Sequence, residues 1–233
     1  TFKGLEKGQF YFVKFYIVRT TILNENTIGG NIMLKKGENP NHPKEGASIT
    51  VDPIRDLKAI NKIKRMLKKT SPRDHLLFVL GINNGLRISD LLNLKVEQVI
   101  DLEPDEELTI TEQKTKKKNV LMINKAVHQS LHTYLDSVEL KDADPLFKSF
   151  KRPTALTVPA ASNLVKRWCS DAGLRGNYAS HTLRKTWGYI QRKEFGTSFE
   201  VICKRFKHSS PAVTMRYLGI EDREVTKILL HEI

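Results

Sequence analysis

The stretch from residue 181 to residue 217 places four reactive or charged side chains on a series of short predicted helices. His181 and Arg184 are three residues apart and therefore share one helix face. His208 follows a second predicted helix, and Tyr217 closes a third. These residues offer a proton-transfer group, a fixed cation, a polar donor and a hydroxyl nucleophile. The set suits attack on a phosphodiester, because its non-bridging oxygens need donors and the phenol must lose its proton.

The charge of the chain points to a polyanionic partner. Lysine and arginine number 39 against 26 aspartate and glutamate residues, which gives a formal net charge of +13 over 233 residues. Nucleic acid is the first partner to expect for such a field. An anionic membrane is second, but no stretch reaches the ~18 apolar residues of a spanning helix. We therefore expect no membrane partner and a cytoplasmic location, nucleoid-associated if the source is prokaryotic.

Cofactor signals are missing from the sequence. The two cysteines, Cys169 and Cys203, lack the CxxC spacing of a zinc site and are too few for a disulfide framework. Both are expected to be small buried hydrophobes. No P-loop and no clustered carboxylates of the two-metal type are present, so no cofactor is expected.

The first 50 residues differ from the rest of the chain. Residues 10–18 are rich in aromatic and β-branched side chains, which predicts a strand. Turn residues follow, and residues 35–47 contain the glycines and prolines typical of a linker. We expect residues 1–50 to form a small β-containing appendage and a linker.

From Asp52 the pattern becomes helical. Asp52 and the following proline predict a helix start, and apolar residues then recur at helical spacing up to Leu67. A second helix is predicted to begin at Ser71 and to end at Gly85, where the left-handed backbone is tolerated. Arg87 is thus held at a tight turn between two apolar helices, and Ser89 is expected to cap the next helix, residues 90–94.

Two strands and two further helices are predicted between Arg87 and His181. Strands at residues 108–111 and 120–123 flank a lysine-rich turn, whose charges alone indicate a solvated surface. Helices are predicted at residues 126–135 and 159–172. Trp168 lies on the apolar face of the second one and is expected to pack in the core.

Two motifs resemble those of the tyrosine recombinases, or phage-type integrases. His181-x-x-Arg184, His208 and Tyr217 are similar to the C-terminal box of this family, and the segment from Gly85 to Leu94, with Arg87, is similar to the first box. The resemblance runs from about residue 52 to about residue 220. It implies a mainly α fold with a small antiparallel β-sheet (α+β), with a catalytic domain over residues 51–220.

The resemblance also implies the chemistry. Tyr217 would attack a DNA phosphate to form a 3′-phosphotyrosyl link, without metal or ATP. Arg87 and Arg184 would clamp the phosphate oxygens, His181 would accept or position the tyrosine proton, and His208 would donate a hydrogen bond to the phosphate. A 5′ hydroxyl from a partner duplex would then reverse the step.

A lysine on the hairpin completes the set that the resemblance implies. Lys114-Thr115-Lys116 is similar to the lysine signature of the family, so Lys114 is the expected general acid and Lys116 the reserve. Basic residues near the site are expected to contact DNA phosphates. These expected DNA contacts are Lys116, Lys117, Lys118, Lys166, Arg167 and Lys185.

Two positions depart from the family pattern. Lys185 stands where many relatives have histidine, and Lys207 stands where glycine is common. In the N-terminal region, the helical clamp domain of the family is about twice as long as residues 1–50. Either that domain has been removed or the protein works with a reduced clamp.

Double-stranded DNA is the expected partner, bound by a dimer or tetramer as is usual in the family. Residues 221–233 form a predicted helical tail, which either folds back or is donated to a neighbouring subunit. Two other functions remain open at this point. They are a type IB topoisomerase-like enzyme and a DNA-binding regulator with an inactive recombinase fold.

Overall fold

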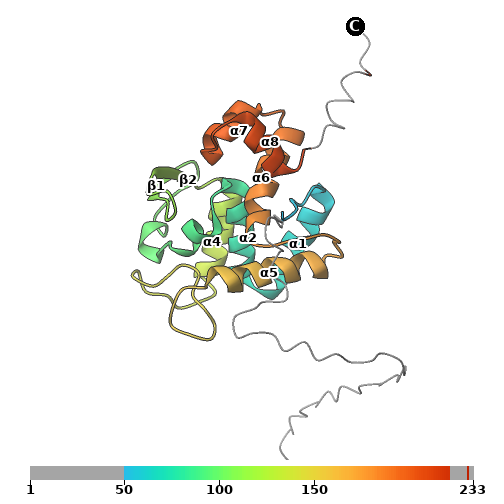
Figure 1. Ribbon diagram of the computed structural model, residues 1–233. Helices are drawn as coiled ribbons and strands as arrows, with labels where there is room; N and C mark the ends of the chain where they lie inside the picture. Colours follow the sequence, from blue (N-terminus) through green and yellow to red (C-terminus); the bar gives the residue numbers. More distant parts are fainter. Residues whose placement is uncertain (1–49, 221–229, 231–233) are drawn as a thin grey trace, which may run out of the picture. The chain divides into compact units, whose positions relative to one another are not determined.

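The computed structural model describes residues 50–220 and residue 230, and this part is mainly helical with one small sheet (Figure 1). The predicted appendage of residues 1–50 and the tail of residues 221–233 lie almost wholly outside it. The helices are α1 (Leu57–Thr70), α2 (Pro72–Asn84), α3 (Ile88–Leu92), the 3-10 helix η1 (Val96–Gln98), α4 (Lys125–Leu135), α5 (Val158–Asp171), α6 (His181–Lys193), α7 (Phe199–Phe206) and α8 (Pro211–Leu218). Strands β1 (Glu107–Thr111) and β2 (Lys118–Met122) complete the fold. The predicted fold class is confirmed.

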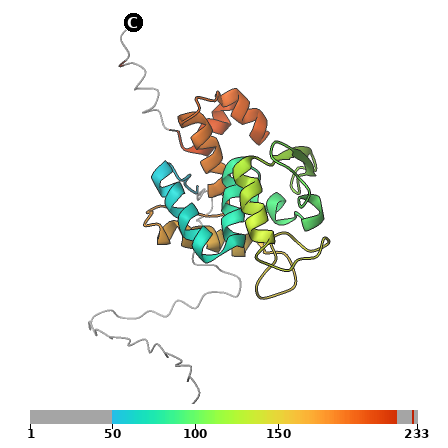
Figure 2. The ribbon, with the colours of Figure 1, turned by 180° about the vertical axis from the view of Figure 1, so that it is seen from behind.

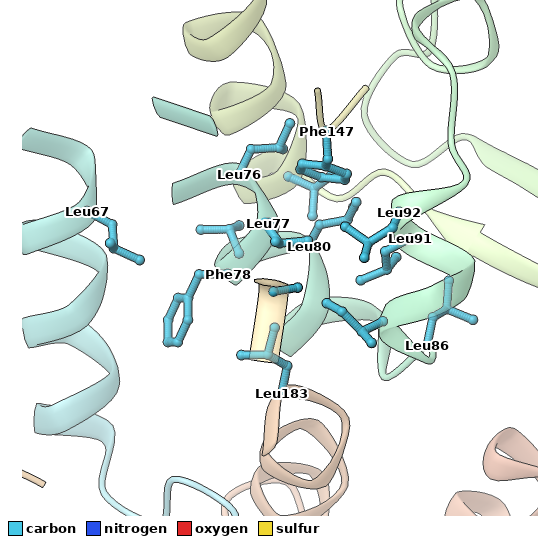
Figure 3. Close-up of a cluster of buried hydrophobic side chains, with 14 of the residues drawn as sticks. Leu67, Leu76, Leu77, Phe78, Leu80, Leu86, Leu91, Leu92, Phe147 and Leu183 are labelled. Carbon is cyan, nitrogen blue, oxygen red and sulfur yellow. The ribbon is translucent and has the colours of Figure 1, made fainter. Parts of the chain in front are cut away.

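Helix α2 is the centre of the main core. It is apolar around most of its circumference, as expected for a helix enclosed by others, and α1, α4 and α6 pack against it. Two opposite views show α1 on one side of it and the hairpin on the other (Figures 1 and 2). Leu67 of α1, Leu183 of α6 and Phe147 converge on its leucines (Figure 3). This packing fixes the carboxyl end of α2, from which the first arginine motif emerges.

The start of α1 differs from the prediction. Asp56, and not Asp52, caps the helix, since its carboxylate accepts the amides of Lys58 and Ala59 at 3.0 and 3.2 Å. Asp52 instead pairs with Asn177, through its own amide at 2.7 Å and its carboxylate at 2.9 Å. Asp52 therefore anchors an extended segment to the loop before α6, a long-range contact that local spacing cannot reveal.

The start of α3 also corrects a prediction. Arg87, and not Ser89, occupies the N-cap position, with extended backbone at φ −70° and ψ 143°. Its carbonyl already accepts the amides of Asp90 and Leu91, so Ser89 lies inside the helix. The predicted cap at Ser71 and the stop at Gly85 are both confirmed.

The hairpin follows the predicted strands closely. Its register pairs Glu107 with Met122 and Thr111 with Lys118. Asn84, the last residue of α2, donates to the carbonyl of Met122 at 3.1 Å and accepts its amide at 2.7 Å. The hairpin is thus attached directly to the end of α2.

Helices α7 and α8 pack on α6 around a small separate core. This core contains Ile202, Phe206 and Leu218. Gly188 of α6 makes the close approach possible, because a Cβ atom there would lie 2.7 Å from Phe206 and 2.9 Å from Leu218. We call α7, α8 and this core the C-terminal lobe.

Two smaller expectations, for the cysteines and for Trp168, are met. Cys169 and Cys203 are buried free thiols. Trp168 is buried and packs edge-on against Phe78, with ring centroids 6.0 Å apart. Within the described residues, no helix is long and apolar enough to cross a membrane.

The turn at Gly85 gives a first prediction. Gly85 and Gly196 both have left-handed backbone, at φ 60° and 66°, but a Cβ atom at Gly85 would lie 2.6 Å from the Trp187 ring, whereas one at Gly196 would meet nothing within 4 Å. Gly196→Ala should lower the free energy of unfolding by about 1–2 kcal/mol through backbone strain. Gly85→Ala should suffer the same strain and lose about 1–3 kcal/mol more of the free energy of unfolding through overpacking. Urea denaturation of both variants measures the difference, and equal losses would contradict the tight packing.

Candidate active site

Arg87 is held at the junction of three elements. Gly85 turns the chain out of α2 with φ 60°, and buried Leu86 anchors the turn. The Arg87 side chain is 17% exposed, and its Nη1 lies 2.9 Å from the carboxylate of Glu112, in the turn of the hairpin. The guanidinium therefore faces the site from a rigid base and keeps a partly open surface.

Arg184 joins the two ends of the site. It is 3% exposed, and it donates to the carbonyl of Gly85 at 2.7 Å and to that of Phe206 at 2.9 Å. Its guanidinium also lies over the Phe206 ring, 4.3 Å from the centroid. Burial lowers the pKa of Arg184 to about 10, so the group stays charged at neutral pH. A guanidinium has five N–H donors, so those that do not bind the two carbonyls remain available for a ligand.

Tyr217 lies on α8 between the two histidines. Its hydroxyl is 3.3 Å from Nδ1 of His181, and its ring centroid is 5.0 Å from that of His208. Burial raises the pKa of Tyr217, although the charges of Arg184 and Arg87 oppose this shift. The phenol therefore keeps its proton at neutral pH until a base accepts it.

Both histidines are predominantly neutral at pH 7. Desolvation and then the charge of Arg184 lower the pKa of His181. Desolvation, with the charges of Arg184 and Arg87, lowers the pKa of His208 to about 4. Nδ1 of His208 is 3.0 Å from the hydroxyl of Thr214. A neutral imidazole can act as a base, which is the state that His181 needs beside the Tyr217 hydroxyl.

The predicted hairpin lysines lie at the turn beside this cluster. Lys114 is exposed, and its charge helps to lower the pKa of His181, which indicates that the two are near one another. Lys116, Lys117 and Lys118 are exposed on the same turn, and Lys116 has left-handed backbone at φ 58°.

The remaining expected DNA contacts lie elsewhere. Lys166 and Arg167 are exposed on α5, at the far end of the described part from α7 and α8 (Figure 1). Lys185, the last of the expected DNA contacts, is 5% exposed, and its Nζ lies 4.9 Å from the centroid of the Tyr217 ring. The reason is its position next to Arg184 on the buried part of α6.

The sequence interpretation missed several residues that support the site. Glu112 is buried and contacts Arg87, but at the start of the lysine-rich turn it looked like part of a solvated charge run. Arg205 donates to the carbonyls of Asn84 and Val120, at 2.7 and 2.8 Å, and no local pattern marks it. Asp90 accepts the amide of Gln113 at 2.8 Å. These three residues fix the hairpin against α2, α3 and α7.

The cluster can bind and activate a phosphate ester. Two guanidinium groups and two imidazoles surround one phenol, which supplies donors for oxyanions, a base and a nucleophile. In the described part of the chain, no three His, Cys, Asp or Glu side chains gather into a group that could hold a metal ion.

Comparison with known sequences gives relatives of one kind. The "Probable integrase/recombinase YoeC" of Bacillus subtilis (strain 168) is 37% identical over 174 residues, which cover 74% of this chain and 91% of that protein. "Tyrosine recombinase XerC" of Caldanaerobacter subterraneus subsp. tengcongensis is 27% identical, over 72% of this chain and 46% of its own length. The matched region thus spans about half of that XerC.

Solved structures share the fold at low identity. The crystal structure of XerA recombinase superposes with a TM-score of 0.62 at 18% identity, over 80% of this chain and 68% of that one. A post-cleavage complex of XerH site-specific recombinase with a palindromic difH substrate superposes with a TM-score of 0.61 at 18% identity. The match covers 77% of this chain and 53% of that one. Residues 53–224, more than half of the chain, match the Phage integrase family. This protein therefore belongs to the phage integrase family.

Proposed function

We propose that this protein is a tyrosine-type site-specific recombinase that cuts and rejoins DNA through a 3′-phosphotyrosyl intermediate. The observation that carries the proposal is the Tyr217 hydroxyl, 3.3 Å from Nδ1 of His181 and beside two arginines. The relatives named integrase or recombinase support the same chemistry. Residues 51–220 would form the catalytic domain.

The first step transfers a phosphoryl group from DNA to the enzyme. His181 accepts the proton of Tyr217 as the phenol oxygen bonds to phosphorus. Arg87 and Arg184 stabilise the added negative charge on the non-bridging oxygens. Lys114 gives a proton to the 5′ oxygen as the P–O bond to it breaks. The phosphotyrosyl bond conserves the phosphodiester energy, so the step consumes no ATP, and we propose that it needs no metal.

His208 would donate a hydrogen bond to the same phosphate. When the hydroxyl of Thr214 donates to Nδ1, the single proton of the neutral ring lies on Nε2. That N–H is then free for a phosphate oxygen. This tautomer requires the Thr214 hydroxyl to donate to Nδ1 of His208 and not to the carbonyl of Ser210, which lies 3.4 Å from the same hydroxyl.

Double-stranded DNA is the proposed substrate, and two or four copies would act together on it. Lys116, Lys117 and Lys118 would contact phosphates near the cleavage point, and Lys166 and Arg167 would do so farther away. One structural relative is titled as a lambda integrase dimer bound to a core site. Residues 221–233 would be donated to a neighbouring subunit, and the protein would work where the DNA lies, in the cytoplasm of a prokaryotic cell.

Replacing the nucleophile tests the proposal directly. Wild-type protein should form a covalent adduct with nicked duplexes cut from the DNA flanking the gene, in the presence of EDTA. Tyr217→Phe should form none and should bind the duplex with nearly unchanged affinity, because only the reacting oxygen is lost. Tyr178→Phe removes a phenol outside the site and is the control. Denaturing gels detect the adduct, and an adduct with Tyr217→Phe would rule out this nucleophile.

Arg184→Lys should slow adduct formation by about 10²–10³-fold, as expected when oxyanion donors are removed. Lysine keeps the charge but cannot bridge the carbonyls of Gly85 and Phe206. Arg65→Lys, on the exposed face of α1, should leave the rate unchanged. Single-turnover rates at matched folded fraction measure this effect, and a rate within a few-fold of wild type would contradict it.

The pKa of His208 predicts how stability depends on pH. Unfolded histidine takes up its proton near pH 6.5, whereas folded His208 does so only near pH 4. The unfolded state therefore binds more protons in this window, and the free energy of unfolding should fall as pH drops from about 6.5 to about 4. His208→Asn should flatten part of this dependence, while His75 and His181, whose pKa values are also lowered, keep the rest. Urea titrations at several pH values measure the slopes, and identical slopes would contradict the assignment.

A further inference from the structure

The turn that carries Lys114 is organised around Glu112. The carbonyl of Glu112 accepts the amide of Lys116 at 2.9 Å, and its amide donates to the carbonyl of Lys117 at 3.0 Å. Its carboxylate accepts hydrogen bonds from the hydroxyl of Thr115 and, at 2.6 Å, from the amide of Asn119. One side chain thus holds both sides of the turn, with Lys114 between them.

The same carboxylate contacts two cations outside the hairpin. One of its oxygens lies 2.9 Å from Nη1 of Arg87, and the other lies 3.5 Å from Nζ of Lys207. Glu112 is 0% exposed. Burial raises its pKa, but the hydrogen bonds from Thr115 and Asn119 and the charge of Arg87 outweigh this and lower the pKa to about 2. The group is therefore a fixed anion that links the turn to a phosphate-binding arginine.

Lys207 occupies an unusual backbone position. It follows the last residue of α7 and has left-handed backbone, at φ 55° and ψ 40°, which favours glycine. Its Nζ donates to the carbonyl of Lys118, at the start of β2, at 2.6 Å. A glycine would relieve the backbone strain but would lose this attachment. Strain of this kind persists where the surrounding structure requires the side chain.

These contacts connect three parts of the site. Glu112 fixes the turn, Lys207, which directly precedes His208, attaches the end of α7 to the hairpin, and Arg87 shares the Glu112 carboxylate. We propose that Glu112 and Lys207 are positioning residues that place the Lys114 ammonium against the leaving 5′ oxygen. We call the pair the hairpin clamp. The inference rests on the proposed role of Lys114 as general acid.

The chemistry of the leaving group separates positioning from general stability. A bridging sulfur in place of the 5′ oxygen leaves as a thiolate, whose conjugate acid is far stronger than an alcohol, so it needs no proton donor. A defect that acts through Lys114 should therefore disappear on the sulfur substrate. A defect that acts through folding or through DNA binding should remain on both substrates.

Lys207→Gly is the decisive variant, because it removes the attachment while it relaxes the backbone. On an ordinary nicked duplex we expect adduct formation to slow by about 10- to 100-fold, which is part of the contribution of a general acid. On the matched 5′-phosphorothiolate duplex we expect a rate within about 3-fold of wild type, because proton donation is no longer needed. Lys204→Gln removes one exposed charge from the same helix and should change neither rate.

Glu112→Gln provides a second, partly different readout. Glutamine keeps the size of the side chain but removes the anion beside Arg87, so the sulfur substrate should restore only part of the lost rate. Thermal unfolding of each variant shows that the compared samples are folded. A full restoration for Glu112→Gln would show that the carboxylate does not act through Arg87, and would limit the clamp to the hairpin.

Lys114→Ala distinguishes a failure of the clamp from a failure of the proposed mechanism. If the sulfur substrate does not restore the rate of Lys114→Ala, the general-acid role is wrong and the clamp falls with it. Suppose instead that the sulfur substrate restores the rate of Lys114→Ala. If Lys207→Gly is then equally slow on both substrates, or is as fast as wild type on both, the clamp is wrong and the recombinase proposal stands. Restoration of both variants supports the clamp.

Discussion

The whole site depends on the two hydrogen bonds that Arg184 donates, to Gly85 and to Phe206. Gly85 ends α2, in the main core, and Phe206 ends α7, in the C-terminal lobe. One buried guanidinium therefore sets the distance between the element that presents Arg87 and the one that presents His208. Both partners are backbone carbonyls, so these two bonds do not depend on the side chain at either position. The charge that binds these carbonyls is also the charge proposed to bind phosphate, so the scaffold and the chemistry share one residue.

Assembling so many cations is unfavourable without an anion. Arg87, Arg184 and Lys207 lie close together, and among their described neighbours Glu112 is the carboxylate that contacts two of them. Two features reduce the repulsion between these cations. Both histidines are neutral at pH 7, and the buried carboxylate of Glu112, with a pKa near 2, is charged. A bound phosphate would add the missing negative charge, and the site would then be more stable with DNA than without it.

Local sequence patterns predicted the helices and strands better than the contacts between them. The turn at Gly85 and the hairpin were predictable because glycine geometry and strand alternation act within a few residues. The cap at Asp56 was missed because Asp52 has an equally plausible local pattern, and its true partner, Asn177, is 125 residues away. Glu112 was missed because the burial of a carboxylate just before a run of lysines depends on how the hairpin docks. The departure at Lys207 was visible in the sequence, but its meaning required the backbone angle and the contact with Lys118.

The position of Tyr217 in the smaller of two cores bears on how cleavage is controlled. The arginines and the hairpin are attached to α2, whose side chains lie deep in the main core. Tyr217 packs at the edge of a core formed by Ile202, Phe206 and Leu218. Opening a unit with few buried apolar contacts costs less free energy than global unfolding. The two arginines and the hairpin can therefore stay assembled while the nucleophile is docked or withdrawn. The bond from Arg184 to Phe206 and the attachment of Lys207 to the hairpin are the contacts that resist withdrawal.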